Sequence, residues 1–268
     1  MDWTEAQDLL GRLAASPQFG LISDIDGTLS PIVDHPEDAK ITRRNRELLD
    51  KLNKEIALVA LVSGRAAKDA QERVGLRHLT YIGNHGLEHW HDGELHIMPE
   101  VATHRPALEA AATELRALDV EGVHLEDKGA TLSLHYRLNS DSAAFAESYA
   151  TNFAEVAEHH GLKLSSGRMV FEFKPQIEAD KGTALRSLIE EHKLDAALYI
   201  GDDTTDVAAL KMARQSRETG LCDAWGGGVQ SGESPEEVAA TADFLVSGVE
   251  GVEELLSWLL IASKASST

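Results

Sequence analysis

The stretch Phe19–Thr28 reads FGLISDIDGT, in which a short apolar run leads directly into two aspartates, a glycine and a threonine. A second run, Ile56–Val62, is apolar throughout, which is typical of a strand buried on both faces of a parallel sheet. Between the two runs, Thr42–Leu52 is charged and has apolar residues at helical spacing, and Thr80–Ile82 is a further short strand candidate. This alternation predicts an α/β fold with a doubly wound, Rossmann-like parallel sheet.

The pattern changes near residue 100. Pro106 is expected to open a helix, and Leu132, Leu134 and Tyr136 alternate with polar residues as in a strand with one covered face. A helix over about 142–160 follows, and then a strand in which Met169, Phe171 and Phe173 share a face. We therefore expect residues 100–177 to form a separate α+β unit, inserted into a core domain that comprises residues 1–99 and 178–268.

After Asp180 the alternation of buried strands and helices returns. Lys181–His192 is expected to be a helix, Ala197–Ile200 a short buried strand, and Asp206–Ala213 another helix. A C-terminal helix carries a stripe of leucines and valines whose simplest interpretation is core packing.

The overall charge limits the classes of partner. The chain has 268 residues, with 25 Lys and Arg against 45 Asp and Glu, a formal net charge of -20. This balance disfavours nucleic acid and anionic membrane surfaces as partners, because both require a basic surface. A small anionic substrate is still compatible with it, since a few cations and a metal ion can make one pocket positive. Solubility is the simplest meaning of the remaining acidity.

Several features of the sequence bear on the cellular compartment of the protein. The single cysteine, Cys222, fits a reducing compartment, and Met1–Leu10 lacks the basic and apolar regions of a secretory signal. No apolar stretch reaches the length of a membrane span. We expect a cytoplasmic protein; a monomer is the simplest assumption about its assembly.

The first candidate site is Asp24–Thr28, directly after the first strand. In an open α/β sheet, ligands bind beyond the carboxyl ends of the strands. Asp24 and Asp26 repel each other unless a cation or a shared proton intervenes, and Mg²⁺ would relieve this repulsion. One carboxylate could then attack phosphorus while the other handles a proton. The alternative is an Asp-rich turn that caps a helix.

Two further candidates follow other strands or open helices. Ser63-Gly64-Arg65 comes after the buried run Ile56–Val62, and its hydroxyl and backbone N–H groups could bind an anion, or could simply cap a helix. Lys181 stands at a helix start, where a cation opposes the helix dipole. Its position is understandable if it pairs with a carboxylate or phosphate; a surface lysine is the alternative.

The fourth candidate is Gly201–Asp206, after the strand Ala197–Ile200. Its three carboxylates in five residues suggest a metal or charge-balancing site, although a solvated acidic loop has the same composition. All four candidates lie where a strand or loop meets the following helix, in segments that could share one sheet edge.

These four strings resemble the four motifs of the haloacid dehalogenase superfamily of phosphatases, and the insertion resembles that superfamily's large α/β cap. The finer resemblance, from about Phe19 to the C-terminus, is to the trehalose-phosphatase family. It rests on Asp24–Val33, His85–Glu88, Glu126–Gly129, His135–Arg137, Asp180–Gly182 and the loop that begins at Asp202.

The resemblance implies roles for the motif residues. Asp24 would be the nucleophile that forms a phosphoaspartyl intermediate, and Asp26 would protonate the leaving sugar oxygen and then activate water. Ser63, Gly64 and Lys181 would hold the phosphoryl oxygens.

The resemblance also implies a Mg²⁺ cofactor. Its ligands would be Asp24, the carbonyl of Asp26, and Asp202, with Asp203 in or just behind that shell. The cap would close over the site and supply sugar contacts. The candidates for gripping the sugar are Glu126, Lys128 and Glu172 in the cap, and Arg65, Asn84 and His85 in the core. For Glu126 and Lys128 the alternative is a surface charge pair.

One stretch departs from the family pattern, because Asp206 is followed by Val207-Ala208-Ala209 where the family usually has an acidic pair. This departure leaves the substrate open. Trehalose 6-phosphate is the first hypothesis. The alternatives are a related phosphatase acting on sucrose phosphate, a glycosyl phosphoglycerate or a hexose phosphate, a phosphotransferase or mutase, and a non-catalytic sugar-phosphate sensor.

Overall fold

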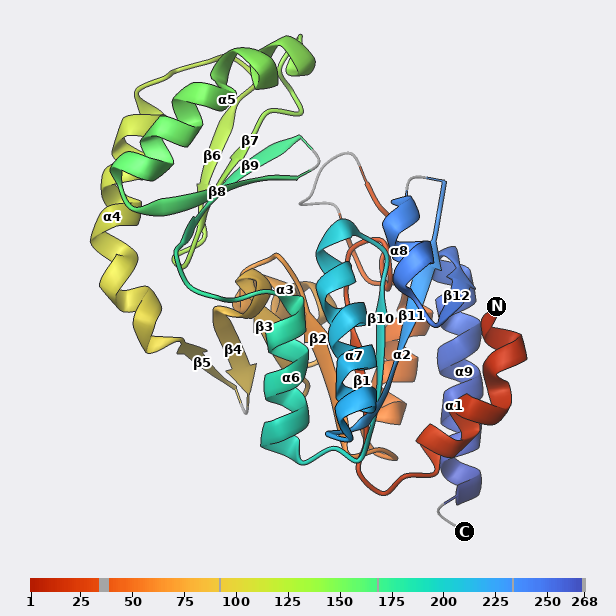
Figure 1. Cartoon of the computed structure of the whole chain (residues 1–268). Helices are drawn as coiled ribbons and strands as arrows, with labels where there is room; N and C mark the ends of the chain where they lie inside the picture. The colour runs from red at the N-terminus through yellow and green to blue at the C-terminus, as the bar shows by residue number, and fades with distance from the viewer. Residues whose placement is uncertain (34–38, 92, 168, 233, 267–268) are drawn as a thin grey trace. The chain divides into compact units, whose positions relative to one another are not determined.

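Two units make up the computed structural model, which describes residues 1–33, 39–91, 93–167, 169–232 and 234–266 (Figure 1). The larger unit comprises Met1–His96 and Ala179–Thr268, and the smaller unit is Ile97–Glu178. The smaller unit is thus inserted between two halves of the larger one, and residues 100–177 lie within it. Among the described residues, we find no helix with both the length and the apolar character to cross a membrane.

An eight-stranded sheet forms the centre of the larger unit. Its strand order is β12-β11-β10-β1-β2-β3-β4-β5, with parallel pairing from β12 to β3 and an antiparallel pair between β3 and β4. The strands are β1 Phe19–Ser23, β2 Leu58–Val62, β3 Thr80–Gly83, β4 Glu88–His91, β5 Glu94–Ile97, β10 Ala196–Gly201, β11 Asp223–Gln230 and β12 Phe244–Ser247.

Helices cover both faces of this sheet, as the doubly wound prediction requires. One layer consists of α1 Gln7–Ala14, α2 Arg43–Leu52, α3 Ala67–Val74 and α9 Gly248–Ser266. The other consists of α6 Lys181–His192, α7 Val207–Thr219 and α8 Glu236–Thr241. Neighbouring residues of β1 point to opposite layers, since Leu21 packs with the first and Ile22 with the second. The buried apolar strands therefore follow from a sheet that is covered twice, and the α/β prediction is confirmed.

The departure after Asp206 has a packing role. Val207 and Ala209, at the start of α7, are buried in the second layer. Gly182 of α6 lies so close to α7 that a Cβ there would come within 2.7 Å of the Ala208 carbonyl oxygen. Gly182 therefore allows the close approach of these helices, and the buried Val207 and Ala209 side chains pack within the second layer.

The smaller unit has an antiparallel sheet of order β6-β7-β9-β8. Its elements are α4 Pro99–Arg116, β6 His124–Asp127, β7 Leu132–His135, α5 Ser142–His159, β8 Leu162–Gly167 and β9 Val170–Pro175. Both helices pack on one face, over a core that includes Leu108, Leu134, Phe153 and Phe171 (Figure 1). The opposite face carries the row Glu126, Ser133, Glu172 and Ser165, which are paired across the four strands.

Two predictions about this unit were wrong. The helix does not open at Pro106 but at Pro99, which occupies its first turn, where a missing N–H costs nothing. Pro106 lies inside α4, where it removes one intrahelical hydrogen bond. Met169 does not belong to the strand with Phe171; it precedes β9 in a left-handed conformation with a φ of 57° and is partly exposed.

Candidate active site

The carboxyl ends of three neighbouring strands bring the candidate residues together. Ser23, at the end of β1, is in register with Ile200 of β10 and Leu61 of β2. The pairing continues one residue further, because the Asp24 N–H donates to the Ile200 carbonyl at 2.8 Å. Asp24, Ser63 and Asp202 follow these three strands, so they emerge at the same edge of the sheet.

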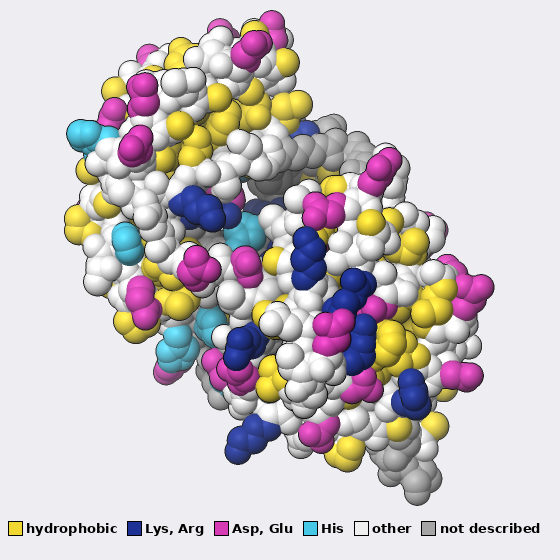
Figure 2. All heavy atoms as spheres, in the orientation of Figure 1, with side chains coloured by type: hydrophobic (Ala, Val, Ile, Leu, Met, Phe, Trp, Pro, Cys, Tyr) yellow, Lys and Arg dark blue, Asp and Glu magenta, His cyan; other side chains and the backbone are white. Residues whose placement is uncertain are grey.

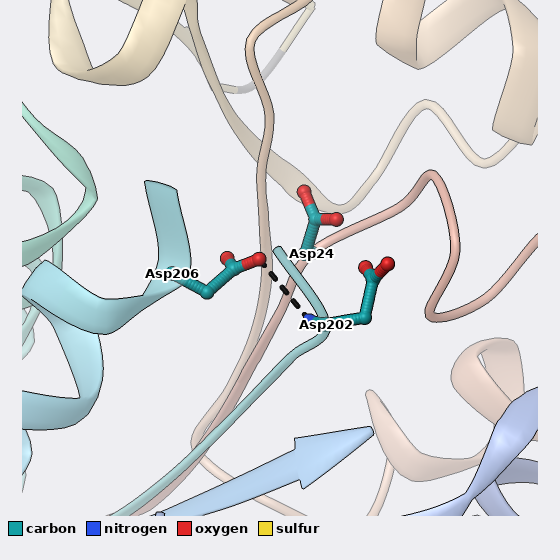
Figure 3. A group of neighbouring side chains, drawn as sticks. All are labelled: Asp24, Asp202 and Asp206. Atoms are coloured by element: carbon teal, nitrogen blue, oxygen red, sulfur yellow. Dashed lines mark hydrogen bonds between the residues drawn. The ribbon is translucent and has the colours of Figure 1, made fainter. Parts of the chain in front are cut away.

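Three buried carboxylates meet at this edge. Asp24, Asp202 and Asp206 each offer an oxygen within 4.8 Å of those of the other two. In Figure 3, Asp206 extends from the start of α7 toward the loops that carry Asp24 and Asp202. Asp203, which was proposed as a metal residue, is exposed and is not part of this group. Asp206, which was not among the predicted site residues, is the third carboxylate of this group.

Asp206 accepts hydrogen bonds at both of its oxygens. Its Oδ1 accepts from the Lys181 ammonium at 2.7 Å and from the Tyr199 hydroxyl. Its Oδ2 accepts from the backbone N–H groups of Asp202, at 3.1 Å, and Asp203, at 2.9 Å. A fully buried carboxylate needs such partners. Asp206 therefore serves as an anchor that fixes both Lys181 and the Asp202 loop.

Lys181 is held at the centre of the site. The Asp180 side chain caps α6 by accepting from the Thr183 N–H at 2.8 Å, which makes Lys181 the first residue of the helix. Its ammonium donates to Asp24 Oδ1 at 2.8 Å and to Asp206 Oδ1. Burial alone would lower the pKa of Lys181, but the two carboxylates outweigh it and raise that pKa. The ammonium stays charged, and the pairing predicted for this helix start is present.

Negative charge exceeds positive charge in this cluster. Three carboxylates face one ammonium, and burial raises the pKa of Asp24 well above its usual range and that of Asp202 to about 7. Asp24 and Asp202 each use one oxygen in a hydrogen bond, the latter with the Thr28 hydroxyl at 3.0 Å. Both raised pKa values reflect carboxylates that lack enough positive charge, and a set of oxygen donors in that situation fits a hard divalent cation such as Mg²⁺.

Gly27 makes room for the Asp202 carboxylate. Its φ of 88° lies in the left-handed region, and a Cβ there would come within 2.1 Å of Asp202 Oδ2. A residue with a side chain would displace that carboxylate. The glycine in the Asp24–Thr28 turn is therefore required by the neighbouring loop as well as by the turn itself.

Asp26 is held by a different cation. The Arg65 guanidinium binds it in a bidentate pair, with Nε–Oδ2 and Nη2–Oδ1 distances of 2.7 and 2.8 Å. Arg65 also donates to Asp69 at 3.3 Å. Arg65, expected on the substrate side, thus contacts Asp26, and the two form a charge-balanced pair next to the three-carboxylate group.

The turn Asn84–Gly86 supports the loop Ser63–Arg65. Asn84 N–H donates to the Arg65 carbonyl at 2.7 Å, and His85 N–H donates to the Ser63 carbonyl at 3.1 Å. Asn84 and His85 have φ angles of 48° and 58°, which are uncommon for residues with a side chain. Such strain persists only where neighbouring structure holds it, and it is frequent at functional sites.

Packing and capping complete this support. A Cβ on Gly64 would come within 2.7 Å of the His85 ring, so the ring can lie there only because residue 64 has no side chain. The Ser63 hydroxyl accepts from the Arg65 N–H at 3.1 Å, and it does not cap α3. Glu88 caps that helix, since its buried carboxylate accepts from the Ala67 N–H at 2.8 Å. Glu88 belongs to the family motif but was not predicted as part of the site; it is the one buried residue of β4, whose other residues are half-buried or exposed, so the local sequence gives no signal for it.

The smaller unit gathers the predicted sugar-side residues on the open face of its sheet. Lys128 Nζ lies 3.6 Å from Glu172 Oε1, and Lys174 Nζ lies 2.7 Å from Glu172 Oε2. Glu126 Oε2 lies 3.1 Å from His135 Nε2. The structure thus adds Lys174 and His135 to the three residues expected there. Together they form a group of ionisable side chains on one face of the sheet.

Sequence comparison places these features in a family. The trehalose-phosphatase family model matches residues 22–236. The trehalose-phosphate phosphatase of Mycobacterium marinum is 37% identical over 202 residues, which are 72% of this chain and 51% of that protein. The probable trehalose-phosphate phosphatase D of Arabidopsis thaliana is 28% identical over 269 residues, covering 93% of this chain and 70% of that protein. The chain spans about half the length of the mycobacterial relatives that it matches.

Solved structures show the same fold. The C-terminal domain of the Candida albicans trehalose-6-phosphate phosphatase matches with a TM-score of 0.72 at 20% identity, covering 95% of this chain and 96% of that one. A haloacid dehalogenase-like hydrolase from Bacteroides thetaiotaomicron matches with a TM-score of 0.58 at 17% identity, covering 89% and 98%. The core and its insertion therefore have the fold of the haloacid dehalogenase-like hydrolases, and the chain belongs to the trehalose-phosphatase family.

Proposed function

We propose that this protein hydrolyses trehalose 6-phosphate to trehalose and phosphate, with Mg²⁺ as cofactor. The observation that carries the proposal is the buried cluster of Asp24, Lys181, Asp202 and Asp206 at a sheet edge, in a chain that the family model matches over residues 22–236. Phosphoryl transfer depends mainly on positioning and charge neutralisation, and such a cluster supplies both.

Asp24 acts as the nucleophile in this proposal. Its carboxylate oxygen bonds to phosphorus as the bond between phosphorus and the sugar oxygen breaks, and Asp26 gives that oxygen a proton. Asp26 then takes a proton from water, whose oxygen attacks phosphorus and releases Asp24. The bidentate pair with Arg65 occupies both Asp26 oxygens and belongs to the ionised carboxylate, so one of its two hydrogen bonds must be released before Asp26 carries the proton that it donates.

The surrounding groups bind the phosphoryl oxygens. Lys181, whose ammonium already contacts Asp24, and the Ser63-Gly64 loop are placed at the edge where the phosphate would lie. Asp24, the Asp26 carbonyl and Asp202 would hold Mg²⁺, which neutralises charge on the phosphoryl group when bound. Asp203 lies outside the three-carboxylate group, and its N–H helps to hold Asp206.

The smaller unit supplies the sugar contacts in this proposal. Glu126, Lys128 and Glu172 lie on one sheet face and carry the charged acceptors and donors that suit sugar hydroxyls. In this proposal Asn84 and His85, in the turn Asn84–Gly86 of the larger unit, also contact the sugar. An ion-paired surface is the alternative for these charges, and a substrate-dependent measurement separates the two.

The substrate is proposed to be a small molecule. On the face shown in Figure 2, acidic side chains are spread over the surface rather than gathered in one patch, and basic side chains are interspersed with them. That distribution suits solubility and gives no basic stripe on this face for a nucleic acid. A cytoplasmic location stays a prediction.

The test is phosphate release with Mg²⁺ on trehalose 6-phosphate, sucrose 6-phosphate, glucose 6-phosphate and phosphorylated mannosylglycerate. We expect a strong preference for trehalose 6-phosphate. A preference for another sugar would keep the phosphatase but reject the trehalose assignment. Binding of a sugar phosphate without any release would favour the sensor alternative.

Glu126→Gln tests the sugar site directly. We expect this change to raise KM for trehalose 6-phosphate roughly tenfold, because the hydrogen bond from a sugar hydroxyl then has a neutral acceptor in place of a charged one. KM for p-nitrophenyl phosphate, which has no sugar, should stay unchanged. Glu121→Gln, at an exposed glutamate of the same unit, is the control. Equal effects of Glu126→Gln on both substrates would remove Glu126 from the sugar site.

A further inference from the structure

The end of β6 and the turn that follows it carry side chains on both faces of the small sheet. Glu126 and Lys128 are two residues apart, and their partners His135 and Glu172 lie on the open face. Asp127, between them, is in register with Leu132, whose side chain belongs to the core under the helices. Asp127 therefore points to the side on which α4 packs, opposite to its two neighbours.

Arg105 of α4 meets Asp127 there. Its Nη1 and Nη2 atoms each lie 2.7 Å from one Asp127 oxygen, in a bidentate pair. Nη1 also donates to the Gly129 carbonyl at 2.9 Å, and the Gly129 N–H donates back to Asp127 Oδ1 at 2.9 Å. Glu109, one helical turn along α4, accepts from Arg105 Nε at 3.0 Å and orients the guanidinium.

These contacts close a ring around the backbone that holds Lys128. Arg105 binds the side chain of Asp127, which precedes Lys128, and the carbonyl oxygen of Gly129, which follows Lys128. Lys128 N–H itself donates to the Thr131 carbonyl at 3.0 Å, so the turn is tied from within as well. The Arg105 hydrogen bonds also hold the pKa of Asp127 below its ordinary range, which keeps the pair ionised at neutral pH.

We propose that Arg105 and Asp127 are positioning residues that set the affinity for the sugar, because they fix from the helix side the end of β6, which presents Glu126, and the turn after it, which presents Lys128. The inference rests on the proposed sugar-binding role of those two residues. A planar fork is needed to grip Asp127 and Gly129 together, so lysine at position 105 can supply the charge but not the geometry. A small displacement of binding groups is enough to weaken a site of this kind.

The experiment measures KM and kcat of Arg105→Met and Asp127→Asn on trehalose 6-phosphate and on p-nitrophenyl phosphate. We expect KM for the sugar phosphate to rise roughly tenfold, with kcat and both constants for the aryl phosphate unchanged. The double variant should be no worse than either single one, because both remove the same contact. Arg105→Lys should recover only part of the loss.

Glu114→Gln is the matched control. Glu114 also lies on α4 and links it to His160, just after α5, at 2.9 Å, but it is not part of the ring around Lys128. If Glu114→Gln raised the sugar KM as much as Arg105→Met, general loosening of the unit would explain the effect and the proposal would fail. An unchanged sugar KM in Arg105→Met, or parallel losses on both substrates, would also overturn it.

Measurements on the wild-type protein and on Glu126→Gln distinguish failure of the positioning proposal from failure of the proposed function. If Glu126→Gln weakens sugar binding and Arg105→Met does not, the sugar site stands and the positioning role is rejected. If the wild type prefers a different sugar phosphate, the trehalose assignment is rejected and the same variants are measured on the preferred sugar.

Discussion

The two charged groups of this molecule differ in how far they are removed from water. In the core, the side chains of Lys181, Asp24 and Asp206 are 3%, 6% and 0% exposed. On the open face of the small sheet, Lys128 and its partner Glu172 are 10% and 15% exposed, and Glu126 is 48% exposed. Buried charges are costly when they lose a partner, whereas exposed pairs contribute little. The core group therefore depends on its internal partners, whereas Glu126 of the sheet group is open to water.

The largest expected effect is on turnover, from Asp24→Asn. The variant keeps the shape of the side chain but loses the oxygen that we propose as the nucleophile, so kcat for any phosphate ester should fall by at least about a thousandfold. It also removes one buried negative charge, so the folded state should survive, as circular dichroism would show. Asp8→Asn, at an exposed aspartate of α1, is the control. Substantial residual turnover would assign the nucleophile to another group.

The second prediction compares how much the core group and the sheet group contribute to the free energy of unfolding. Lys181→Met leaves Asp24 and Asp206 buried without their shared ammonium, and should lower the free energy of unfolding by about 3–5 kcal/mol. Lys128→Met removes a longer pair and leaves Glu172 with Lys174 at 2.7 Å, so it should cost at most about 1 kcal/mol. Urea-induced unfolding of both variants measures the difference. Equal losses would mean that burial does not distinguish the two groups.

The smallest effect is the pH dependence of the metal-free protein. The pKa of Asp202 is raised to about 7, so its contribution to stability is complete below its unfolded pKa and is lost as pH rises through 7. Asp202→Asn has no such group, so the wild type should lose several degrees in Tm relative to it between about pH 5 and 8. Mg²⁺ should reverse this loss in the wild type. A Tm difference that does not vary with pH would contradict the origin of the shift.

Much of the site could be predicted because it follows strands that are apolar throughout. Asp24, Ser63 and Asp202 each come directly after such a strand, and parallel strands end at a common edge. Which acid of the Asp202–Asp206 loop turns inward could not be predicted in this way. That choice depends on the short 3₁₀ turn Thr204–Asp206, which buries Asp206 and leaves Asp203 exposed.

The other omissions have related causes. Glu88 reaches the start of α3 because β4 runs antiparallel beside β3, and a single carboxylate in a short strand does not reveal that neighbour. The edge strand β8 was not predicted, since Leu162–Gly167 is half polar and lies outermost in its sheet. The helix start at Pro99 was missed because a second proline, Pro106, gave the same signal. Long-range pairing and repeated local signals therefore account for most of what was missed.

The bond between Lys181 and Asp24 has a consequence for the order in which a newly made chain acquires reactivity. It joins residues 157 positions apart, and the bond between Lys181 and Asp206 adds a third segment, 25 positions further on. Closing so long a loop is entropically costly and occurs only together with the packing of the sheet around it. A ribosome-bound chain that has emerged only as far as the insertion holds Asp24 without its ammonium and without Asp202. On the proposed function, a half-made chain therefore lacks two of the residues that the reaction requires, and reactivity toward phosphate esters would appear only at the end of folding.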